Sequence, residues 1–410
     1  MTALVCVVVL VLAAQMACAA PMVQPTDPPS MMVEVVEGDT VLRTLRVAPP
    51  RVVRVLGAQV VIGDDAPNQW AAGTRLPALV NPTGSVTVGA VVPGSVVVRS
   101  APGGPEYRVD KDYLLDERWA AIGRVATGRI PRGATVYLDY AYCLSRLDTV
   151  QLAGGGVPSI RRGKPAVVCP RPAGAATGYR ALSNIWVRPG ITAVAADDIY
   201  PVGLTPTFPK PDRSGTAATR KLLAAGGKVT IVALGDSVTA GGEASKAELA
   251  FPQLFASTLR KRYPRANIDL VNAGVGGSNS DFGLERLNRD VLAHHPQLVV
   301  IEFVNDMGWP AEKIRANYRE LIARIRAAGA EVVICTPHHI WPEWMGNFDV
   351  ALAALRKVAA EEKVGLADAS ARWAALRAVG IPYETLLVNC INHPDDRGHR
   401  MFVDALMELF

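Results

Sequence analysis

The sequence predicts a two-part α/β protein, in which a β-rich, sandwich-like domain precedes a three-layer α/β/α domain with a parallel sheet. Three observations carry this prediction. Short strand-like runs separated by Gly, Pro and Asp fill residues 21–202. A proline-rich linker is expected at 203–225. From residue 226 to 410, β-branched runs alternate with amphipathic helices, and such alternation requires crossover connections between parallel strands.

The composition allows two cores and excludes two classes of function. Half of the 410 residues are apolar, which is enough for each part to bury a core of its own. The formal net charge of +5 is small for this length and is not gathered in Lys/Arg runs, so we expect no nucleic-acid partner. After residue 20 no run approaches the roughly 18 apolar residues of a membrane span, so we expect no stable membrane insertion.

The first twenty residues are predicted to be a signal peptide. Residues 3–14 form an apolar run that is short for a membrane span, and the small residues at 17–19 suit a signal peptidase. No Lys or Arg precedes the run, which departs from the usual pattern. A lipoprotein anchored through Cys18 is disfavoured, because Gln15, Met16 and Ala17 stand before it. We therefore expect a secreted, periplasmic or extracellular protein.

Four cysteines follow the signal peptide, namely Cys143, Cys169, Cys335 and Cys390. Export permits disulfides, and Cys143 with Cys169 lies in the same half of the chain, so this pair is a candidate bridge and free thiols are the alternative. No Cys/His spacing is typical of a zinc site. We expect no metal and no other cofactor.

The β-rich part is predicted from six runs with strand character. They are separated by turn residues at intervals typical of antiparallel sandwiches or packed sheets. One helix remains an alternative to strand and turn at 114–122, where Leu, Trp and Ile share a face. The six runs span residues 41–49, 51–63, 85–92, 95–100, 134–142 and 181–190.

The α/β part is predicted from five strands and five helices in alternation. In a parallel sheet of this kind, ligands bind at the carboxyl ends of the strands. The strands are expected at 228–236, 266–274, 297–303, 331–337 and 364–370, and the helices at 248–264, 281–295, 311–329, 348–363 and 396–410.

Unusual residues gather at those strand ends. The first strand ends in Gly235-Asp236-Ser237, the second runs into the glycine-rich "NAGVGGSNS", and the third ends in "FVND" with Asn305. The segment "NCINHPDDRGH" precedes the last helix and contains His393. A hydroxyl, unobstructed backbone amides, a carboxamide and an imidazole are the groups that acyl transfer requires.

These four segments, in this order, resemble the blocks of the SGNH hydrolases, also called the GDSL-like lipase/acylhydrolase family. The resemblance covers about residues 226–410 and implies a flavodoxin-like fold. It implies that Ser237 is the nucleophile, that His393 is its general base, and that the amides of Ser237 and Gly277 and the side chain of Asn305 form an oxyanion hole. The activity implied is that of a secreted serine esterase acting on small acyl esters, most simply acetyl.

Two positions depart from the family pattern. The third block usually reads Gly-x-Asn-Asp, whereas here Val304 directly precedes Asn305. The acid expected three residues before His393 is Cys390, and a thiol neither orients the histidine nor stabilises its imidazolium form well. The alternatives are a Ser-His dyad supported by a backbone carbonyl or by Asn389, a displaced carboxylate such as Asp395 or Asp396, or an inactive enzyme.

Further residues at the same edge are candidates for a substrate pocket, which aromatic side chains would suit for a sugar ring or an acyl chain. Each candidate also has a structural alternative: Ser237 and Asn305 as helix caps, His393 as a loop histidine, and His399 as a packed residue. His294 and His295 suit a helix C-terminus. The pocket candidates are Asp236, His338, His339 and Trp341.

Two functions from different classes follow. The first is an esterase that deacylates an ester substrate, such as an acylated polysaccharide or glycoconjugate, with the β-rich part as an accessory domain. The second is a catalytically degenerate protein that binds carbohydrate or a surface through the β-rich part. Retention of Ser237, Asn305 and His393 favours the esterase.

Overall fold

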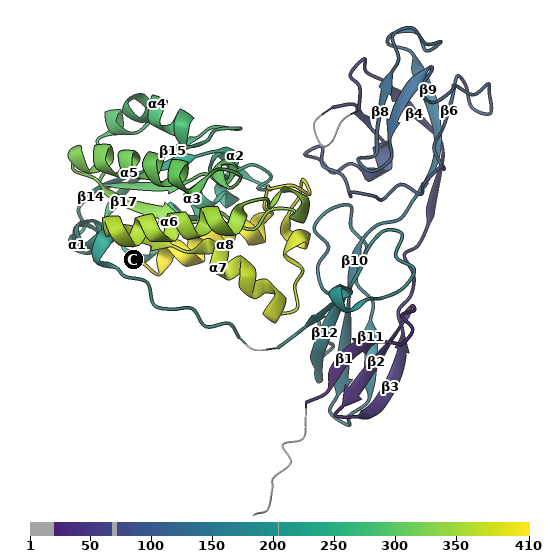
Figure 1. Cartoon of the computed structure of the whole chain (residues 1–410), viewed down its shortest axis with the longest axis horizontal. Coiled ribbons are helices and arrows are strands. Elements are labelled where there is room, and N and C mark those ends of the chain that lie inside the picture. The colour runs from purple at the N-terminus through teal and green to yellow at the C-terminus, as the bar shows by residue number, and fades with distance from the viewer. Residues whose placement is uncertain (1–19, 68–71, 204) are drawn as a thin grey trace, which may run out of the picture.

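The computed structural model describes residues 20–67, 72–203 and 205–410, which form a β-rich part and an α/β part (Figure 1). The predicted signal peptide lies outside the described residues, apart from residue 20. Among the described residues, no helix combines the length and the apolar content needed to cross a membrane.

The β-rich part contains two packed units, and the first is built from both ends of this part. A three-stranded antiparallel sheet faces a four-stranded one across a core that includes Val33, Val35, Val150 and Ile185. The first sheet has the order β1 (Met22–Pro25), β2 (Met32–Glu37), β3 (Thr40–Arg46), and the second has the order β11 (Pro158–Arg161), β10 (Arg146–Ala153), β12 (Tyr179–Val187), β13 (Ile199–Pro201).

The second unit is inserted between β3 and β10 and carries its own core (Figure 1). Its two three-stranded sheets have the orders β4 (Val53–Val61), β9 (Thr135–Tyr142), β6 (Val97–Arg99) and β5 (Thr74–Arg75), β8 (Ala121–Arg124), β7 (Tyr113–Asp116). We call it the inserted β unit. The helix considered at 114–122 is wrong, because Asp116 accepts a hydrogen bond from the Trp119 amide at 3.0 Å and Ala120 has a φ of 48°, which closes the β7–β8 turn.

The α/β part confirms the predicted parallel sheet. Its order is β15 (Asn267–Gly274), β14 (Lys228–Gly235), β16 (Leu298–Glu302), β17 (Glu331–Cys335), β18 (Gly365–Ala367), and neighbouring strands pair in parallel. In chain order this is 2-1-3-4-5, the flavodoxin-like arrangement. The central strands β14 and β16 are buried on both faces, which explains why they read as continuous apolar runs.

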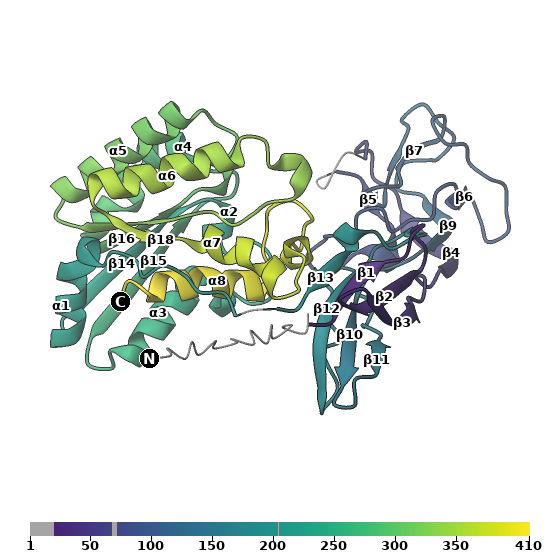
Figure 2. The same cartoon turned by 60° about the horizontal axis from the view of Figure 1, so that its bottom comes forward.

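Helices cover both faces of this sheet, with α4, α5 and α6 on one side and α3 and α8 on the other (Figure 2). The expected linker at 203–225 is partly helical, since α1 occupies its end and buries Leu223 in the core. The short helices α2 and α7 were not predicted. The helices are α1 (Ala217–Ala225), α2 (Ser237–Ala240), α3 (Phe251–Arg262), α4 (Ser280–Asp290), α5 (Ala311–Ala327), α6 (Phe348–Glu362), α7 (Ala369–Ala374) and α8 (Asp396–Met407).

The two parts touch along the segments that lead into α8. The side chain of Asn184 in β12 donates to the carbonyl of Gly380 at 2.7 Å. Val86 and Trp119 of the inserted β unit pack with Cys390 and Ile391 in one apolar cluster. The inserted β unit therefore lies against the loop that carries the predicted catalytic histidine.

Candidate active site

Ser237 is the first residue of α2, and Asp236 alone separates it from the end of β14 at Gly235. Position 235 has no room for a side chain, since a Cβ there would lie 2.0 Å from the Thr239 hydroxyl oxygen, and this explains the glycine. Asp236 caps α2 by accepting a hydrogen bond from the Val238 amide at 2.9 Å, and its other oxygen accepts from the Asn305 amide at 3.2 Å. The prediction that Asp236 lines a substrate pocket is wrong, because its buried carboxyl ties the ends of β14 and β16 together.

Three buried carboxyls lie beneath the strand ends. Burial raises the pKa of Asp236 to about 7 and that of Asp306 to about 6, and burial together with the neighbouring Asp236 raises the pKa of Glu302 well above its ordinary value. Each of these carboxyls is therefore protonated over a wider pH range than an exposed one, Glu302 most of all, which reduces the negative charge buried beneath the strand ends. An oxyanion forming at this edge therefore meets less repulsion than three ionised carboxylates would cause.

His393 lies against Ser237, with 2.9 Å between its Nε2 and the serine Oγ. The loop before α8 holds it there: the Oδ1 of Asn389 accepts hydrogen bonds from the amides of Ile391, Asn392 and His393 at 2.9–3.0 Å. Burial lowers the pKa of His393, and the charge of Glu243 opposes that shift. The imidazole is therefore neutral at neutral pH and can accept the proton of the hydroxyl.

Hydrogen-bond donors surround the serine at the neighbouring strand ends. The carboxamide of Asn305 donates one hydrogen to the carbonyl of Ser278 at 2.7 Å, which leaves its second hydrogen available. Gly277 has a φ of 72°, a backbone conformation that favours glycine. Among the described residues, the amides of Ser237 and Gly277 have no protein acceptor. The sequence-predicted donors Ser237, Gly277 and Asn305 thus all retain a hydrogen for a ligand.

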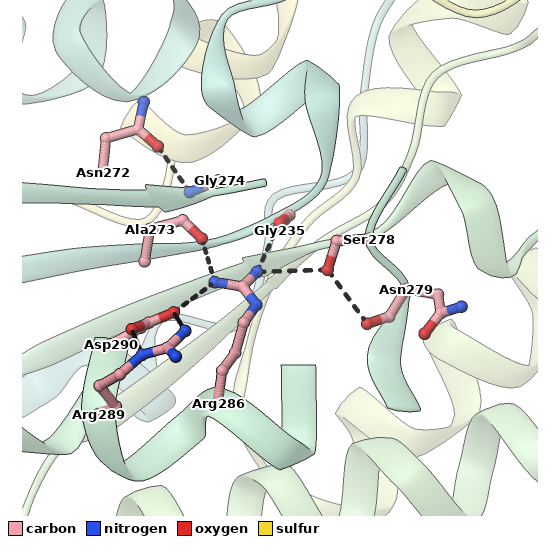
Figure 3. Close-up of polar contacts among 9 residues, drawn as sticks. All are labelled: Gly235, Asn272, Ala273, Gly274, Ser278, Asn279, Arg286, Arg289 and Asp290. Carbon is pink, nitrogen blue, oxygen red and sulfur yellow. Dashed lines mark hydrogen bonds and ion pairs between the residues drawn. The ribbon is translucent and has the colours of Figure 1, made fainter. Parts of the chain in front are cut away.

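Arg286 of α4 connects these strand ends and was missed in the sequence (Figure 3). Its buried guanidinium donates to the carbonyls of Gly235 at 2.8 Å and Ala273 at 2.6 Å, and it lies 3.4 Å from the Ser278 hydroxyl. It therefore holds the ends of β14 and β15 and the glycine-rich loop in one arrangement. The sequence does contain a sign of this role. Arg286 lies three residues after Gly283 in α4, which places a charged side chain on the same, buried face of the helix.

A cavity of about 370 Å³ opens beside His393, between the two parts of the protein. The α/β part contributes Glu243, Asn389 and His393, and the inserted β unit supplies the opposite side. Those opposite residues, which the sequence did not identify, are Gly73, Arg75, Thr83, Gly84, Ser85, Val86 and Trp119.

The predicted replacements for the missing acid do not contact the imidazole. Asn389 uses its Oδ1 on backbone amides, as described above. Asp395 caps α8 and pairs with Arg397 at 2.7 Å, while Asp396 accepts from the Ser245 hydroxyl at 2.6 Å. Cys390 points to the inserted β unit, with its Sγ 3.6 Å from the Val86 carbonyl oxygen, and burial raises the pKa of its thiol to about 11. Position 390 is therefore a packing contact between the two parts.

Of the three aromatic pocket candidates near 340, Trp341 lines a cavity in the described part of the chain. His338 is fully buried against Trp373 and Phe402, so its predicted place in a pocket is wrong. His339 packs edge-on against Phe348 and Tyr383, and it lines none of the described cavities. Trp341 lines a second cavity of about 510 Å³ between the two parts, together with Trp186, Arg188, Glu343 and Glu384.

The remaining candidates are structural. The Nδ1 of His399 accepts from the Phe251 amide at 3.3 Å. Cys143, Cys169, Cys335 and Cys390 are all free, so the suggested Cys143–Cys169 disulfide is not formed. Among the described residues, no cluster of three or more His, Cys, Asp or Glu side chains is arranged to hold a metal ion.

Comparison with known proteins points to one family of hydrolases. The family model of the GDSL-like lipase/acylhydrolase family matches residues 233–401. The chain is 31% identical over 145 residues to the esterase TesA of Pseudomonas aeruginosa, covering 33% of this chain and 68% of that one. It is 32% identical over 107 residues to an arylesterase of Vibrio mimicus, covering 25% of this chain and 52%, about half, of that relative.

Solved structures are similar as well. One is a two-domain esterase active on acetylated mannans, with a TM-score of 0.44 and 24% identity, and the similarity covers 49% of this chain and 53% of that one. Another is a variant of an acetyl-xylooligosaccharide esterase of Geobacillus, with a TM-score of 0.39 and 21% identity, covering 44% of this chain and 94% of that one.

Proposed function

Because the chain belongs to the GDSL-like lipase/acylhydrolase family, we propose that it is a serine esterase that hydrolyses small acyl esters, most simply acetyl esters, on carbohydrate. The observation that carries the proposal is the 2.9 Å separation between Ser237 Oγ and His393 Nε2. A hydroxyl at this distance from a neutral imidazole is an activated nucleophile.

In the acylation step, Ser237 Oγ attacks the carbonyl carbon of the ester and its proton passes to His393 Nε2. The carbonyl oxygen becomes an oxyanion that accepts hydrogen bonds from the amides of Ser237 and Gly277 and from the Asn305 carboxamide. When the tetrahedral intermediate collapses, the bond to the alcohol oxygen breaks. That oxygen takes the proton from His393, and the acyl group remains on Ser237.

In the deacylation step, water replaces the alcohol. His393 Nε2 takes one proton of the water while the water oxygen attacks the acyl carbon. Collapse of the second tetrahedral intermediate returns that proton to Ser237 Oγ and releases the carboxylic acid. One ester and one water yield one acid and one alcohol, and no cofactor takes part.

The lining of the cavity beside His393, to which Ser237, Gly277 and Asn305 do not contribute, favours a small acyl group on a polar alcohol. Of its ten lining residues, Val86 and Trp119 are the two large apolar ones, whereas a long acyl chain requires an extended apolar lining. The hydroxyl oxygens of Thr83 and Ser85 can still accept hydrogen bonds from a polar alcohol, and the indole of Trp119 offers a flat face to a sugar ring. The predicted signal peptide supports export, and we propose an acylated polysaccharide or glycoconjugate as the substrate and residues 21–202 as an accessory domain.

The test is hydrolysis of an aryl acetate and of aryl esters with longer acyl chains. We expect the mature protein to prefer the acetate, and Ser237→Ala to lower kcat by about 10⁴-fold or more because the nucleophile is lost. Ser245→Ala, which changes an exposed serine eight residues later in the chain, is the control. Equal rates for the mature protein and Ser237→Ala would exclude the esterase.

A degenerate carbohydrate-binding protein is the second candidate, and the cysteine at position 390 is the observation that favours it. The close approach of Ser237 and His393 favours the esterase instead. Retention on insoluble polysaccharide without any ester hydrolysis would support the binding protein.

A further inference from the structure

The imidazole of His393 is supported on only one of its two nitrogens. Nε2 lies on Ser237, but Nδ1 has no hydrogen-bond partner within residues 20–67, 72–203 and 205–410. In a serine–histidine pair, an acceptor on Nδ1–H selects the tautomer that leaves Nε2 free, and its negative charge stabilises the imidazolium formed during attack. The site as described lacks that group.

A carboxylate lies next to that edge of the ring. If Gly242 had a Cβ, it would lie 3.1 Å from both Cε1 and Nδ1 of His393, so the backbone at 242 runs along this edge. The following residue is Glu243, which lines the same cavity as His393. Its negative charge acts on the imidazole, since it raises the pKa of His393 against the effect of burial.

Glu243 is held in place and keeps one oxygen free. The hydroxyl of Ser85, in the inserted β unit, donates to Oε1 at 2.9 Å. The other oxygen, Oε2, is buried and has no hydrogen-bond partner among the described residues. Glu243 also has a φ of 64°, a backbone conformation that residues other than glycine rarely adopt and that is concentrated at functional sites.

We propose that Glu243 is the positioning residue of His393, that it replaces the carboxylate missing at position 390, and that Ser85 of the β-rich part orients it. This inference rests on the proposed esterase function. When Ser237 gives its proton to Nε2, the ring becomes positively charged, and the negative charge of Glu243 stabilises it, with Oε2 as the oxygen available to accept from the Nδ1–H in the complex. The proton on Nδ1 stays on the ring. Such contacts are often long in structures without substrate and shorten in the complex.

The other charged groups near the ring do not fit this role. Arg75 lines the cavity but is a cation and donates to the Trp119 carbonyl at 2.9 Å. His338 and His399 are buried, and burial lowers the pKa of both, so they are neutral. Asp395 and Asp396 are bound to Arg397 and Ser245 as described above. Glu243 is the one carboxylate among the residues that line this cavity.

The first experiment measures kcat, KM and the pH profile of aryl acetate hydrolysis by the mature chain and by Glu243→Gln. We expect kcat to fall by about 10²-fold with little change in KM, because the imidazolium forms only after substrate binds. We also expect the acid limb of the profile to move to lower pH, because a neutral side chain no longer favours the protonated ring. Glu243→Asp keeps the charge and should retain more activity than Glu243→Gln.

The matched control is Glu248→Gln, the same change at an exposed position five residues later in the chain. It should leave kcat and the pH profile unchanged. Thermal melting of each variant separates a loss of folding from a loss of catalysis.

The second experiment leaves Glu243 intact and removes its support from the β-rich part. Ser85→Ala should lower kcat by about threefold to tenfold, because one hydrogen bond to a charged group is lost. Ser100→Ala, at an exposed position in the same inserted β unit, should have no effect.

The outcomes separate the inference from the proposed function. If Glu243→Gln and Ser85→Ala keep the kcat and pH profile of the mature chain while Ser237→Ala is inactive, the inference is overturned and the esterase stands. If the mature chain hydrolyses no faster than Ser237→Ala, the esterase and the inference fall together. A fall in kcat with a shifted acid limb, absent in Glu248→Gln, supports the inference.

Discussion

The two sides of the cavity beside His393 are built in different ways. On the α/β side, parallel strands end at one edge, and buried groups such as Asp236 and Arg286 bond the strand ends to one another. On the side of the inserted β unit, single contacts reach across the interface, from Ser85 to Glu243 and from Cys390 to Val86. The comparison indicates that the nucleophile and oxyanion donors are held by a rigid sheet, whereas the surroundings of the base depend on a second part of the chain.

The largest effect on stability should come from replacing Arg286 on the α/β side of the cavity. Arg286→Met leaves the buried carbonyls of Gly235 and Ala273 without donors, which should cost about 3–5 kcal/mol of stability. We expect Tm to fall by about 10 °C, measured by differential scanning calorimetry. The control is Arg289→Met, whose side chain is 76% exposed on the same helix, and an equal fall in its Tm would contradict a special role for Arg286.

The next effect tests the donors on the same side. Asn305→Ala removes one hydrogen-bond donor to the oxyanion and should lower kcat by about 10²–10³-fold in aryl acetate hydrolysis. Asn279→Ala instead removes the cap of α4, which should cost about 1 kcal/mol of stability with kcat preserved. A kcat for Asn305→Ala within twofold of the unchanged protein would remove this side chain from the mechanism.

A smaller effect on kcat/KM is expected from a change of pH. It tests the environment of His393, which lies where the two sides of the cavity meet. Burial lowers the pKa of His393 below its ordinary value of 6.5, so its protonated, inactive form appears only at more acidic pH. We therefore expect kcat/KM to be retained at pH 6.5 and to fall about tenfold per pH unit well below the pKa. A midpoint above 6.5 would show that the imidazole is not shielded as the structure indicates.

The smallest effect should come from the exposed rim between the two parts. Arg118 of the inserted β unit pairs with Glu343, and the side chains are 48% and 52% exposed. A surface ion pair of this kind contributes about 0–1 kcal/mol, so Arg118→Ala should change Tm by no more than about 3 °C and kcat by less than twofold. A larger loss of kcat would show that His393 depends on the Arg118–Glu343 ion pair and not on Ser85.

Much of the α/β part followed from sequence, and so did the residues at its strand ends. The alternation of strands and helices, the place of Ser237 after β14 and that of Asn305 after β16 follow from crossover connections and strand lengths, which leave a local pattern, whereas the flavodoxin-like strand order was implied by the family resemblance. Errors occurred where packing overrode local signals. His338 was expected in a pocket because it follows a strand, but the ring turns into the core between Trp373 and Phe402.

By itself, the sequence determined the family, the parallel sheet and the chemical groups at one edge of it, because each of these depends on residues that are close together along the chain. Only the tertiary structure decided what surrounds the base. Ser85 and Glu243 lie 158 positions apart, and Cys390 contacts Val86 across 304 positions. No local periodicity or motif reports such a contact, since it depends on how two separately built cores pack against each other.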